Sequence, residues 1–501
     1  MRDLVVGIDS STTATKAIAF DRAGVPLHEV RSAYPTQSPQ PGYFEQDPAD
    51  WTNAAAQALR GVAQAVGADR IAALAIGQQR ETFALIDEEG RALRPGILWL
   101  DERARREVAE LSARLGRDRI RDISGKPPDP TPSLYALAWL ARHEPETVTR
   151  ARAVVDVHGF LVRAMTGRVA TSLPCADPLG IIDLARGTWD PGLVAAAGLR
   201  PDQLPALVAP GSVIGTLTAD FAEIAGVSAG LPLIAGAGDG QMAGLGLGAI
   251  EPGLAYLSLG TGVVTGMHVA AMVTADAYRT LASPTGRGFM VETVLRSGMT
   301  LADWVARLTA GRADGETLTR LETEAVALPI GAQGLMLMPY WAGVMNPYWD
   351  EAARGAVLGF GLNHGPAHLF RAVLEGIAME QAVATAALEA SVGRRAERFI
   401  VAGGGVKSRL LMSIMAATLQ RPLAPSPVSE AVAAGAAMLA ATAIGWYPTI
   451  ETAMQSMAQH PERAIEPDPA LVAAYAPRVA VYREIFGATQ PVFARLAALD
   501  A

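Results

Sequence analysis

The sequence predicts an α/β protein built from two large domains of similar architecture. Its 501 residues are too many for one ordinary hydrophobic core, which favours two domains. Short apolar strands alternate with helical stretches along the chain. A strand, a turn of small and hydroxyl residues and a second strand occur at 4–20, and the pattern returns at 254–269, which indicates a duplicated fold. We place the boundary between residues 246 and 252, which gives domains 1–248 and 249–501.

The first domain is expected to alternate strands with helices. Gly24 suits the positive φ of a hairpin turn, and Asp47 or Asp50 can cap a helix. The proline-rich stretch 125–132 interrupts a region in which helices predominate. The expected elements are a hairpin at 4–27, a helix at 47–67, a strand at 71–77, a hairpin at 83–93, a mainly helical region at 100–230 and a strand at 231–234.

The second domain is expected to continue this alternation. The uncharged segment 431–450 is rich in alanine and glycine and contains Pro448, which predicts a buried helix rather than a membrane span. The other expected elements are a hairpin at 254–269, a helical span at 297–328, a strand at 334–340, a helix at 366–392, a strand, glycine turn and helix over 398–419, and a helical tail from 452.

The composition is that of a globular protein and excludes several classes of function. Hydrophobic residues make up 50% of the chain and charged residues 18%, without the bias of disordered sequences. The net charge of −8 argues against a nucleic-acid partner, because phosphates require a basic surface. The single cysteine, Cys175, excludes an internal disulfide framework and fits a reducing compartment. We therefore expect a cytoplasmic protein with no nucleic-acid or membrane partner.

The glycine-rich segment 235–248 follows an apolar strand and carries one acid, Asp239. Gly238, Gly240 and Ala243 have the G-x-G-x-x-A spacing of a dinucleotide-binding turn. The acid that such a turn requires about twenty residues further on is missing. Asp239 would also repel a pyrophosphate in that position, so the segment does not favour dinucleotide binding.

Two other interpretations of Asp239 remain open from the residues alone. Asp239 can cap the helix that follows it, which is a structural role. It can also be a general base at the end of a strand, since its small neighbours allow a substrate hydroxyl to come within hydrogen-bonding distance. Phosphoryl transfer to a hydroxyl needs such an acceptor, together with a metal ion and amide donors for the phosphates.

Three turns supply candidate phosphate contacts, although each is also typical of an ordinary tight turn. Asp9 ends a strand, where it can hold Mg²⁺ directly or through water, or bond its own backbone. Amides and hydroxyls of the turns can surround phosphates, and no Walker-type motif is present. The candidate ATP-binding residues are Ser11, Thr12, Thr13, Lys16, Gly260, Thr261, Gly262, Gly403, Gly404, Gly405 and Ser408.

The order of these turns, with Asp239 before the second of them, resembles the FGGY family of carbohydrate kinases. Residues 353–381 resemble that family's C-terminal signature, and the resemblance covers nearly the whole chain. It implies two actin/hexokinase-like (ribonuclease-H-like) domains with nucleotide and sugar in the cleft between them, and ATP and Mg²⁺ as cofactors. It also implies that Asp239 is the general base and that Asp9 and Asp239 hold the metal. The family usually has glycine where Ser11 stands, so the backbone approach to phosphate is expected to differ there.

The acceptor site resembles two branches of this family. The stretch "GQQRETF", with Gln79, Arg80 and Glu81, is similar to the segment that holds polyol hydroxyls in glycerol kinases, and residues 346–355 also resemble those enzymes. Arg80 and Glu81 offer donors and an acceptor to adjacent hydroxyls. Without the family context, the two residues are also typical of a surface Arg–Glu pair beside a hairpin.

Other stretches are closer to xylulokinases. "ILWLDERA", which contains Trp99, resembles a segment of those enzymes, as do residues 160–184. Asp239 is followed by Gly240, where xylulokinases have Asn and glycerol kinases have Gln. We expect Gln241 to supply the hydrogen bond that Gly240 lacks, since such bonds determine which hydroxyl compounds a site accepts.

The sequence therefore predicts an ATP-dependent kinase for a small keto-sugar, with D-xylulose as the first choice. Glycerol, or another polyol or ketopentose such as erythritol or ribulose, is the alternative, and a non-catalytic sugar sensor is the third. The oligomeric state, a homodimer included, and the stereochemistry of the sugar are left open. The residues expected to contact the substrate are Gln79, Arg80, Glu81, Trp99, Asp239 and Gln241.

Overall fold

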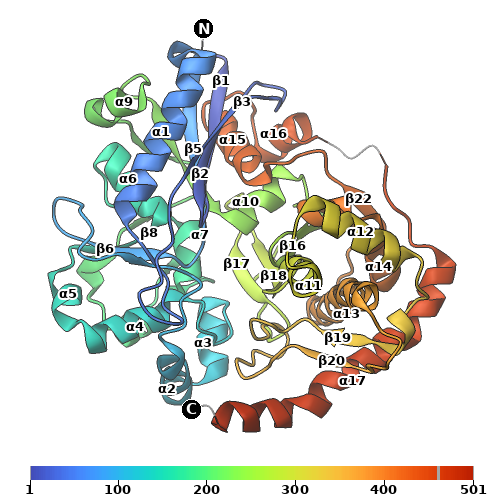
Figure 1. Ribbon diagram of the computed structural model, residues 1–501. Helices are drawn as coiled ribbons and strands as arrows, with labels where there is room; N and C mark the ends of the chain where they lie inside the picture. The colour runs from blue at the N-terminus through green and yellow to red at the C-terminus, as the bar shows by residue number, and fades with distance from the viewer. Residues whose placement is uncertain (1, 460–462, 500–501) are drawn as a thin grey trace.

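The computed structural model describes residues 2–459 and 463–499, and its first half contains a six-stranded sheet (Figure 1). The strands are β1 (Leu4–Ser10), β2 (Ala14–Phe20), β3 (Pro26–Ala33), β5 (Ile71–Gln78), β13 (Val213–Thr216) and β14 (Pro232–Gly238). They lie in the order β13-β14-β5-β1-β2-β3. β1, β2 and β3 are antiparallel neighbours, whereas β5 and β14 run parallel to β1.

The second half repeats this arrangement. Its strands are β15 (Leu254–Leu259), β16 (Val263–Val269), β17 (Arg279–Ala282), β18 (Phe289–Leu295), β21 (Arg398–Ala402) and β22 (Leu423–Pro425), in the order β17-β18-β16-β15-β21-β22. β15, β16 and β18 are antiparallel, and β21 and β22 run parallel to β15. The series β3-β2-β1-β5-β14 and β18-β16-β15-β21-β22 therefore match in order and direction, which confirms the predicted α/β duplication.

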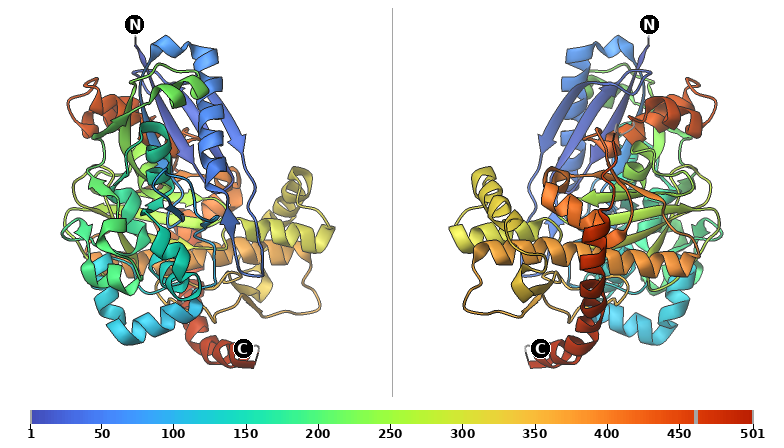
Figure 2. Two further views of the ribbon diagram at one scale, coloured as in Figure 1. Left: turned by 90° about the vertical axis from the view of Figure 1, so that its left-hand side faces the viewer. Right: turned by 90° about the vertical axis from the view of Figure 1, so that its right-hand side faces the viewer.

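Helices cover both faces of the first sheet. Helix α1 (Pro48–Val66) begins after Asp47, whose side chain accepts a hydrogen bond from a backbone amide in the first turn. Because side chains alternate along a strand, Val6 of β1 belongs to the core beneath α1 and Val5 to the core on the other face. Helix α15 (Ala431–Ala443) of the second half lies on that other face (Figures 1 and 2).

Glycines allow α15 to approach the first half closely. Helix α10 (Asp239–Gly246) follows β14 and packs against α15. A Cβ atom added to Gly246 would lie 2.0 Å from the carbonyl oxygen of Ala431, and one added to Gly435 would lie 2.3 Å from that of Met242. The small residues of the 235–248 segment thus serve helix packing, and the two halves share one hydrophobic core there.

Shorter elements extend each sheet. In the first half they are β4 (Glu45–Gln46), β6 (Phe83–Ile86), β7 (Gly96–Ile97), α2 (Arg105–Leu115), α3 (Arg117–Ser124), α4 (Ser133–His143), α5 (Pro145–Arg150), β8 (Ala153–Asp156), α6 (Val157–Thr166), β9 (Ala170–Ser172), α7 (Leu173–Ala176), β10 (Ile182–Asp183), β11 (Thr188–Trp189), α8 (Pro191–Ala196), β12 (Ala206–Val208) and α9 (Ala219–Ala225). In the second half they are α11 (Thr300–Ala310), α12 (Gly315–Val326), β19 (Met336–Met338), β20 (Ala356–Leu358), α13 (Pro366–Val392), α14 (Arg409–Leu419), α16 (Ile450–Met457) and α17 (Pro469–Leu499).

Three expectations are corrected or refined. The hairpin expected at 83–93 forms through the bridge between Ile86 and Ala92 and the hydrogen bonds that flank it, and β6 also pairs with β7 and β8. Short strands interrupt the region at 100–230. The segment expected as a buried helix at 431–450 forms α15 and ends at Ala443. Within the described residues, no helix is both long and apolar enough to cross a membrane.

Candidate active site

Asp9 lies near the end of β1 and is 9% exposed. Its Oδ1 atom is buried and has no hydrogen-bond partner among the described residues. Burial, reinforced by the negative charge of Asp239, raises the pKa of Asp9 to about 7. A buried carboxylate oxygen without a donor is costly unless a cation or a proton neutralises it, so this atom is suited to hold a cation.

In the turn after Asp9, several polar side chains already have hydrogen-bond or ion-pair partners within the protein. The hydroxyl of Ser11 donates to the carbonyl of Ala14 at 3.0 Å, which closes the turn between β1 and β2. The hydroxyl of Thr12 accepts a hydrogen bond from the indole N–H of Trp99 at 2.9 Å. Lys16 forms an ion pair with Glu430, the residue that precedes α15. The side chain of Thr13 is exposed.

Asp239 is the first residue of α10, directly after β14. Gly238 is the N-cap, so the interpretation of Asp239 as the capping residue is wrong by one position. Oδ1 of Asp239 accepts from the Gly240 amide at 2.7 Å and pairs with Nε of Arg80 at 2.8 Å. Both contacts end on Oδ1, and the side chain is 39% exposed, which leaves Oδ2 available to a ligand.

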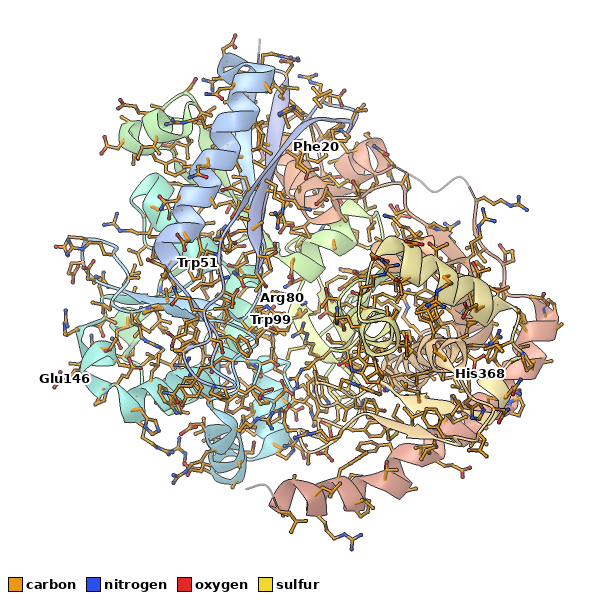
Figure 3. The ribbon with its side chains drawn as sticks, viewed as in Figure 1. Phe20, Trp51, Arg80, Trp99, Glu146 and His368 are labelled. Atoms are coloured by element: carbon orange, nitrogen blue, oxygen red, sulfur yellow. The ribbon has the colours of Figure 1, made fainter. Side chains whose placement is uncertain are left out.

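Gln79, Arg80 and Glu81 follow β5 and are all buried. The interpretation of Arg80 and Glu81 as a surface pair is therefore wrong. Glu81 has a positive φ of 60°, which is an uncommon backbone conformation for a residue other than glycine. Figure 3 places Arg80 and Trp99 where the two halves meet.

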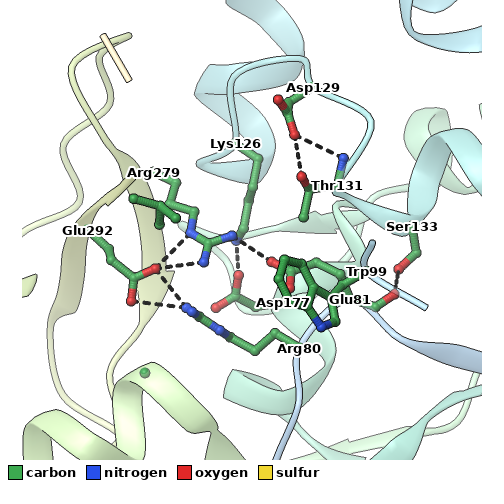
Figure 4. A network of polar contacts seen from close by, with 12 residues as sticks. Arg80, Glu81, Trp99, Lys126, Asp129, Thr131, Ser133, Asp177, Arg279 and Glu292 are labelled. Atoms are coloured by element: carbon green, nitrogen blue, oxygen red, sulfur yellow. Dashed lines mark hydrogen bonds and ion pairs between the residues drawn. The ribbon is translucent and has the colours of Figure 1, made fainter. Parts of the chain in front are cut away.

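Arg80 and Glu81 belong to a network of charges that the sequence did not reveal (Figure 4). Arg80 pairs with Glu292 of β18 at 2.9 Å, and Glu81 pairs with Arg279 of β17 at 2.7 Å. Lys126, from the proline-rich stretch, pairs with Asp177 beside them. The signal available in the sequence was a lone acid inside the apolar stretch "FMVETVL", since charged residues rarely occupy buried strand positions without a partner.

Trp99 and Gln241, the two other predicted substrate contacts, are both held by hydrogen bonds within the protein. Trp99 bridges the first loop and the Gln79–Thr82 segment, because its indole N–H bonds Thr12 and its backbone amide donates to Thr82 at 3.2 Å. Gln241 is fully buried, its amide nitrogen donates to the carbonyl of Pro174 at 3.0 Å, and its Oε1 has no partner among the described residues.

Two turns of the second half lie against each other. The Gly260–Gly262 turn joins β15 to β16, and Gly260 donates to the carbonyl of Gly262 at 3.0 Å. Gly403 follows β21 with φ of 94°, and a Cβ atom there would lie 2.6 Å from the carbonyl oxygen of Leu259. A Cβ on Gly404 would meet open space, so its backbone is accessible.

Ser408 has a defined structural role. Its hydroxyl caps α14 by accepting from the Leu411 amide at 3.1 Å, and it donates to Glu322 at 2.9 Å. Its predicted contact with ATP would have to use the remaining capacity of this hydroxyl or the backbone.

The donor set fits a magnesium ion of the kind bound together with phosphates. Such ions are held by one or two carboxylates, several waters and the phosphates rather than by a complete protein cage. Asp9 offers an unpaired buried oxygen, and Asp239 is close enough to raise its pKa. Among the described residues, no cluster of three or more His, Cys, Asp or Glu side chains forms a metal cage.

Comparisons with known proteins identify the family. Residues 4–246 match the N-terminal domain, and residues 255–444 the C-terminal domain, of the FGGY family of carbohydrate kinases. The chain is 31% identical to a glycerol kinase of Aromatoleum aromaticum, covering 92% of this chain and 94% of the relative. It is 28% identical to a xylulose kinase of Escherichia coli, covering 98% and 100%.

A solved structure agrees with this assignment. A gluconate kinase from Lactobacillus acidophilus has a TM-score of 0.92 at 25% identity, covering 98% of this chain and 99% of that one. The duplicated sheets described above are thus the two actin/hexokinase-like domains of a carbohydrate kinase. The chain belongs to the FGGY family of carbohydrate kinases and is a phosphotransferase.

Proposed function

We propose that this kinase transfers the γ-phosphoryl group of ATP to a hydroxyl of a small keto-sugar, D-xylulose in the first place, with Asp239 as the general base. The observation that carries this proposal is the state of the Asp239 carboxylate. Arg80 and the Gly240 amide fix Oδ1, whereas Oδ2 is available. A positioned carboxylate with one free oxygen at the end of a strand is the arrangement that general-base catalysis requires.

The reaction follows from these positions. The attacking hydroxyl bonds to the γ-phosphorus, its proton passes to Oδ2 of Asp239, and the bond from the γ-phosphorus to the bridging oxygen breaks to leave ADP. Arg80 holds the orientation of Asp239. Asp9, with Asp239, would hold Mg²⁺, which when bound neutralises charge on the phosphates. The amides and hydroxyls of the Ser11–Thr13, Gly260–Gly262 and Gly403–Gly405 turns are the proposed phosphate and nucleotide contacts.

Glycerol or another polyol is the second candidate acceptor. It is supported by the "GQQRETF" stretch and by the glycerol kinase relative. We retain the division into domains 1–248 and 249–501 and a cytoplasmic location as parts of the proposal, with the qualification that α15 of the second domain completes the packing of the first sheet.

A panel assay tests the acceptor. ATP turnover is measured with D-xylulose, L-xylulose, D-ribulose, L-ribulose, glycerol, erythritol and D-gluconate. The proposal expects the highest kcat/KM with D-xylulose. The highest value with glycerol or erythritol would replace D-xylulose by the second candidate. Binding of a sugar and ATP without turnover of any compound would overturn the kinase proposal in favour of a sensor.

A further inference from the structure

Four buried charged residues form a closed ring between the two domains (Figure 4). Nη1 of Arg80 lies 2.9 Å from Oε1 and 3.1 Å from Oε2 of Glu292. Oε1 of Glu292 accepts from Nε of Arg279 at 2.8 Å, and Nη1 of Arg279 donates to Glu81 at 2.7 Å. Glu81 is the chain neighbour of Arg80, which closes the ring. No member exposes more than 7% of its surface, so water screens these pairs little.

The ring has members from both domains, and one of them, Arg80, also pairs with Asp239, the proposed base. Arg80 and Glu81 follow β5 of the first domain, whereas Arg279 and Glu292 stand on β17 and β18 of the second. Nη1 of Arg80 serves the ring while its Nε serves Asp239 at 2.8 Å. The orientation of Asp239 therefore depends, through one guanidinium group, on two residues of the other domain.

Gly240 makes room for the ring. A Cβ atom at this position would lie 2.5 Å from Oε2 of Glu292 and 3.0 Å from Nη2 of Arg80. The space that a side chain after Asp239 would occupy is filled instead by the Arg80–Glu292 pair. Glu292 of the second domain and Arg80 of the first thus take the position from which the residue after the base would otherwise meet the acceptor.

The charges within the ring balance, and Asp239, which shares Arg80 with Glu292, adds a further carboxylate beside it. Two arginines face two glutamates, and the hydroxyl of Tyr256 donates to Oε2 of Glu292 at 2.6 Å. Although burial alone raises the pKa of Glu292, Arg80 and Arg279 bring it down to about 2, so Glu292 is ionised at neutral pH. Lys126 is paired with Asp177. A carboxylate brought into this site would lose its hydration without finding an unpaired cation.

We propose that Arg279 and Glu292 are positioning residues of the acceptor site, and that the charge-balanced ring they form with Arg80 and Glu81 selects an uncharged polyhydroxy acceptor over a sugar acid. This inference rests on the proposed function and deepens it. Glu292 pairs with both arginines, so removing its charge leaves Arg80 with Asp239 alone and Arg279 with Glu81 alone and makes the site more positive by one unit. The site should then lose affinity for the neutral sugar and gain relative affinity for a carboxylate-bearing one.

Glu292→Gln is the direct test, with D-xylulose (or the best neutral substrate of the panel) and D-gluconate as probes. The KM for the neutral sugar is expected to rise roughly 10- to 100-fold, the effect of losing a charged hydrogen bond, while the KM for ATP changes less than about twofold. The ratio of kcat/KM for D-gluconate to that for the neutral sugar should rise by roughly tenfold or more. A purely structural role of Glu292 would lower activity with both sugars alike.

Two further variants secure the result. Gly240→Ala keeps every charge but places a methyl group against Glu292 and Arg80, and it should raise the KM for the neutral sugar even if Glu292→Gln does not fold. Glu380→Gln is the matched control, because Glu380 is also a buried glutamate of the second domain but bonds only Tyr340 and Tyr482 in the described structure. Its acceptor kinetics should equal those of the wild type.

The outcomes separate the inference from the function on which it rests. A wild type that turns over none of the sugars contradicts the proposed function itself. A wild type that phosphorylates a neutral sugar, combined with unchanged KM values and an unchanged gluconate ratio in both Glu292→Gln and Gly240→Ala, overturns the role of the ring alone. D-Gluconate as the best wild-type substrate would also overturn it.

Discussion

Asp239 makes both of its protein contacts through Oδ1 and leaves Oδ2 available, and this arrangement predicts the effect of removing its charge. In Asp239→Asn the amide oxygen can still accept from both Arg80 and the Gly240 amide, but the nitrogen in place of Oδ2 cannot accept a proton. We expect kcat to fall by roughly 10²–10⁴, the range of a lost general base, with little change in the KM for ATP. Steady-state kinetics with the best acceptor measure this. A variant that keeps more than about a tenth of wild-type kcat would remove Asp239 from the role.

Glu380, a buried residue of α13, gives a second prediction at the residue scale. Burial raises its pKa to about 7, although hydrogen bonds from Tyr340 and Tyr482 oppose the shift. Between pH 4.5 and about 7 this carboxyl is therefore protonated in the folded state and ionised in the unfolded state. The free energy of unfolding falls as the pH rises through this window. Above it, the cost of the ionised carboxylate is fully present.

Glu380→Gln removes this titration. The stability of the variant relative to the wild type should rise by about 3 kcal/mol from pH 4.5 to pH 8, because each pKa unit corresponds to 1.36 kcal/mol. Denaturant unfolding of both proteins across the pH range gives the difference and cancels the titration of other groups. A difference that is flat with pH would mean that Glu380 is ionised in the fold already at acid pH.

At the scale of elements, the contact between α10 and α15 depends on glycine. The Cβ of an alanine at 246 would lie 2.0 Å from a backbone carbonyl oxygen of α15, which cannot move as a flexible side chain would. Gly246→Ala is expected to destabilise the protein by about 1–3 kcal/mol, the cost of overpacking. Gly487→Ala is the matched control, since Gly487 lies in α17 with no atom within 4 Å of the added methyl. The control should gain up to about 1 kcal/mol from helix propensity.

Denaturant unfolding compares the two alanine variants. Equal stabilisation of both would contradict the close approach of the helices. The glycines of the 235–248 segment can be explained by helix packing or by close approach of a ligand, and the sequence alone cannot distinguish the two. This comparison tests the packing explanation at Gly246.

Elements whose signals are local could be predicted well. Helix α13 matches its prediction at both ends, since Pro366 begins it and Gly393, at a positive φ of 70°, ends it. The two hairpins were found because their strands pair across a few residues. The strands β17 and β18 pair with each other and β18 with the nearby β16, but they were missed because each carries a buried charged residue that interrupts the apolar pattern of a strand. Arg279 and Glu292 were missed with them, and so was the half of the acceptor network that the second domain supplies.

At the scale of the whole molecule, ion pairs and a shared hydrophobic core join the two domains. A second ionic cluster lies beside the ring, in which Arg296 binds Asp129 of the first domain at 2.7 Å and Glu351 of its own domain at 2.9 Å. The core shared through α15 includes Val5 and Ile18 of the first sheet together with Tyr256 and Ile400 of the second. Each sheet therefore buries part of its apolar surface only in the presence of the other domain.

This shared core predicts cooperative unfolding of the two domains. If one domain unfolded alone, it would expose to water the face of the other sheet and the buried partners of Arg80 and Arg296, which costs far more than an ordinary domain contact. Scanning calorimetry should show one transition, and Gly246→Ala should lower its temperature without splitting it. Hydrogen exchange followed by mass spectrometry provides the independent check: amides of β1 and β15 should share one opening free energy. Two resolved transitions, or strong protection of β15 after β1 has exchanged, would show that the domains are separate folding units and that α15 is detachable.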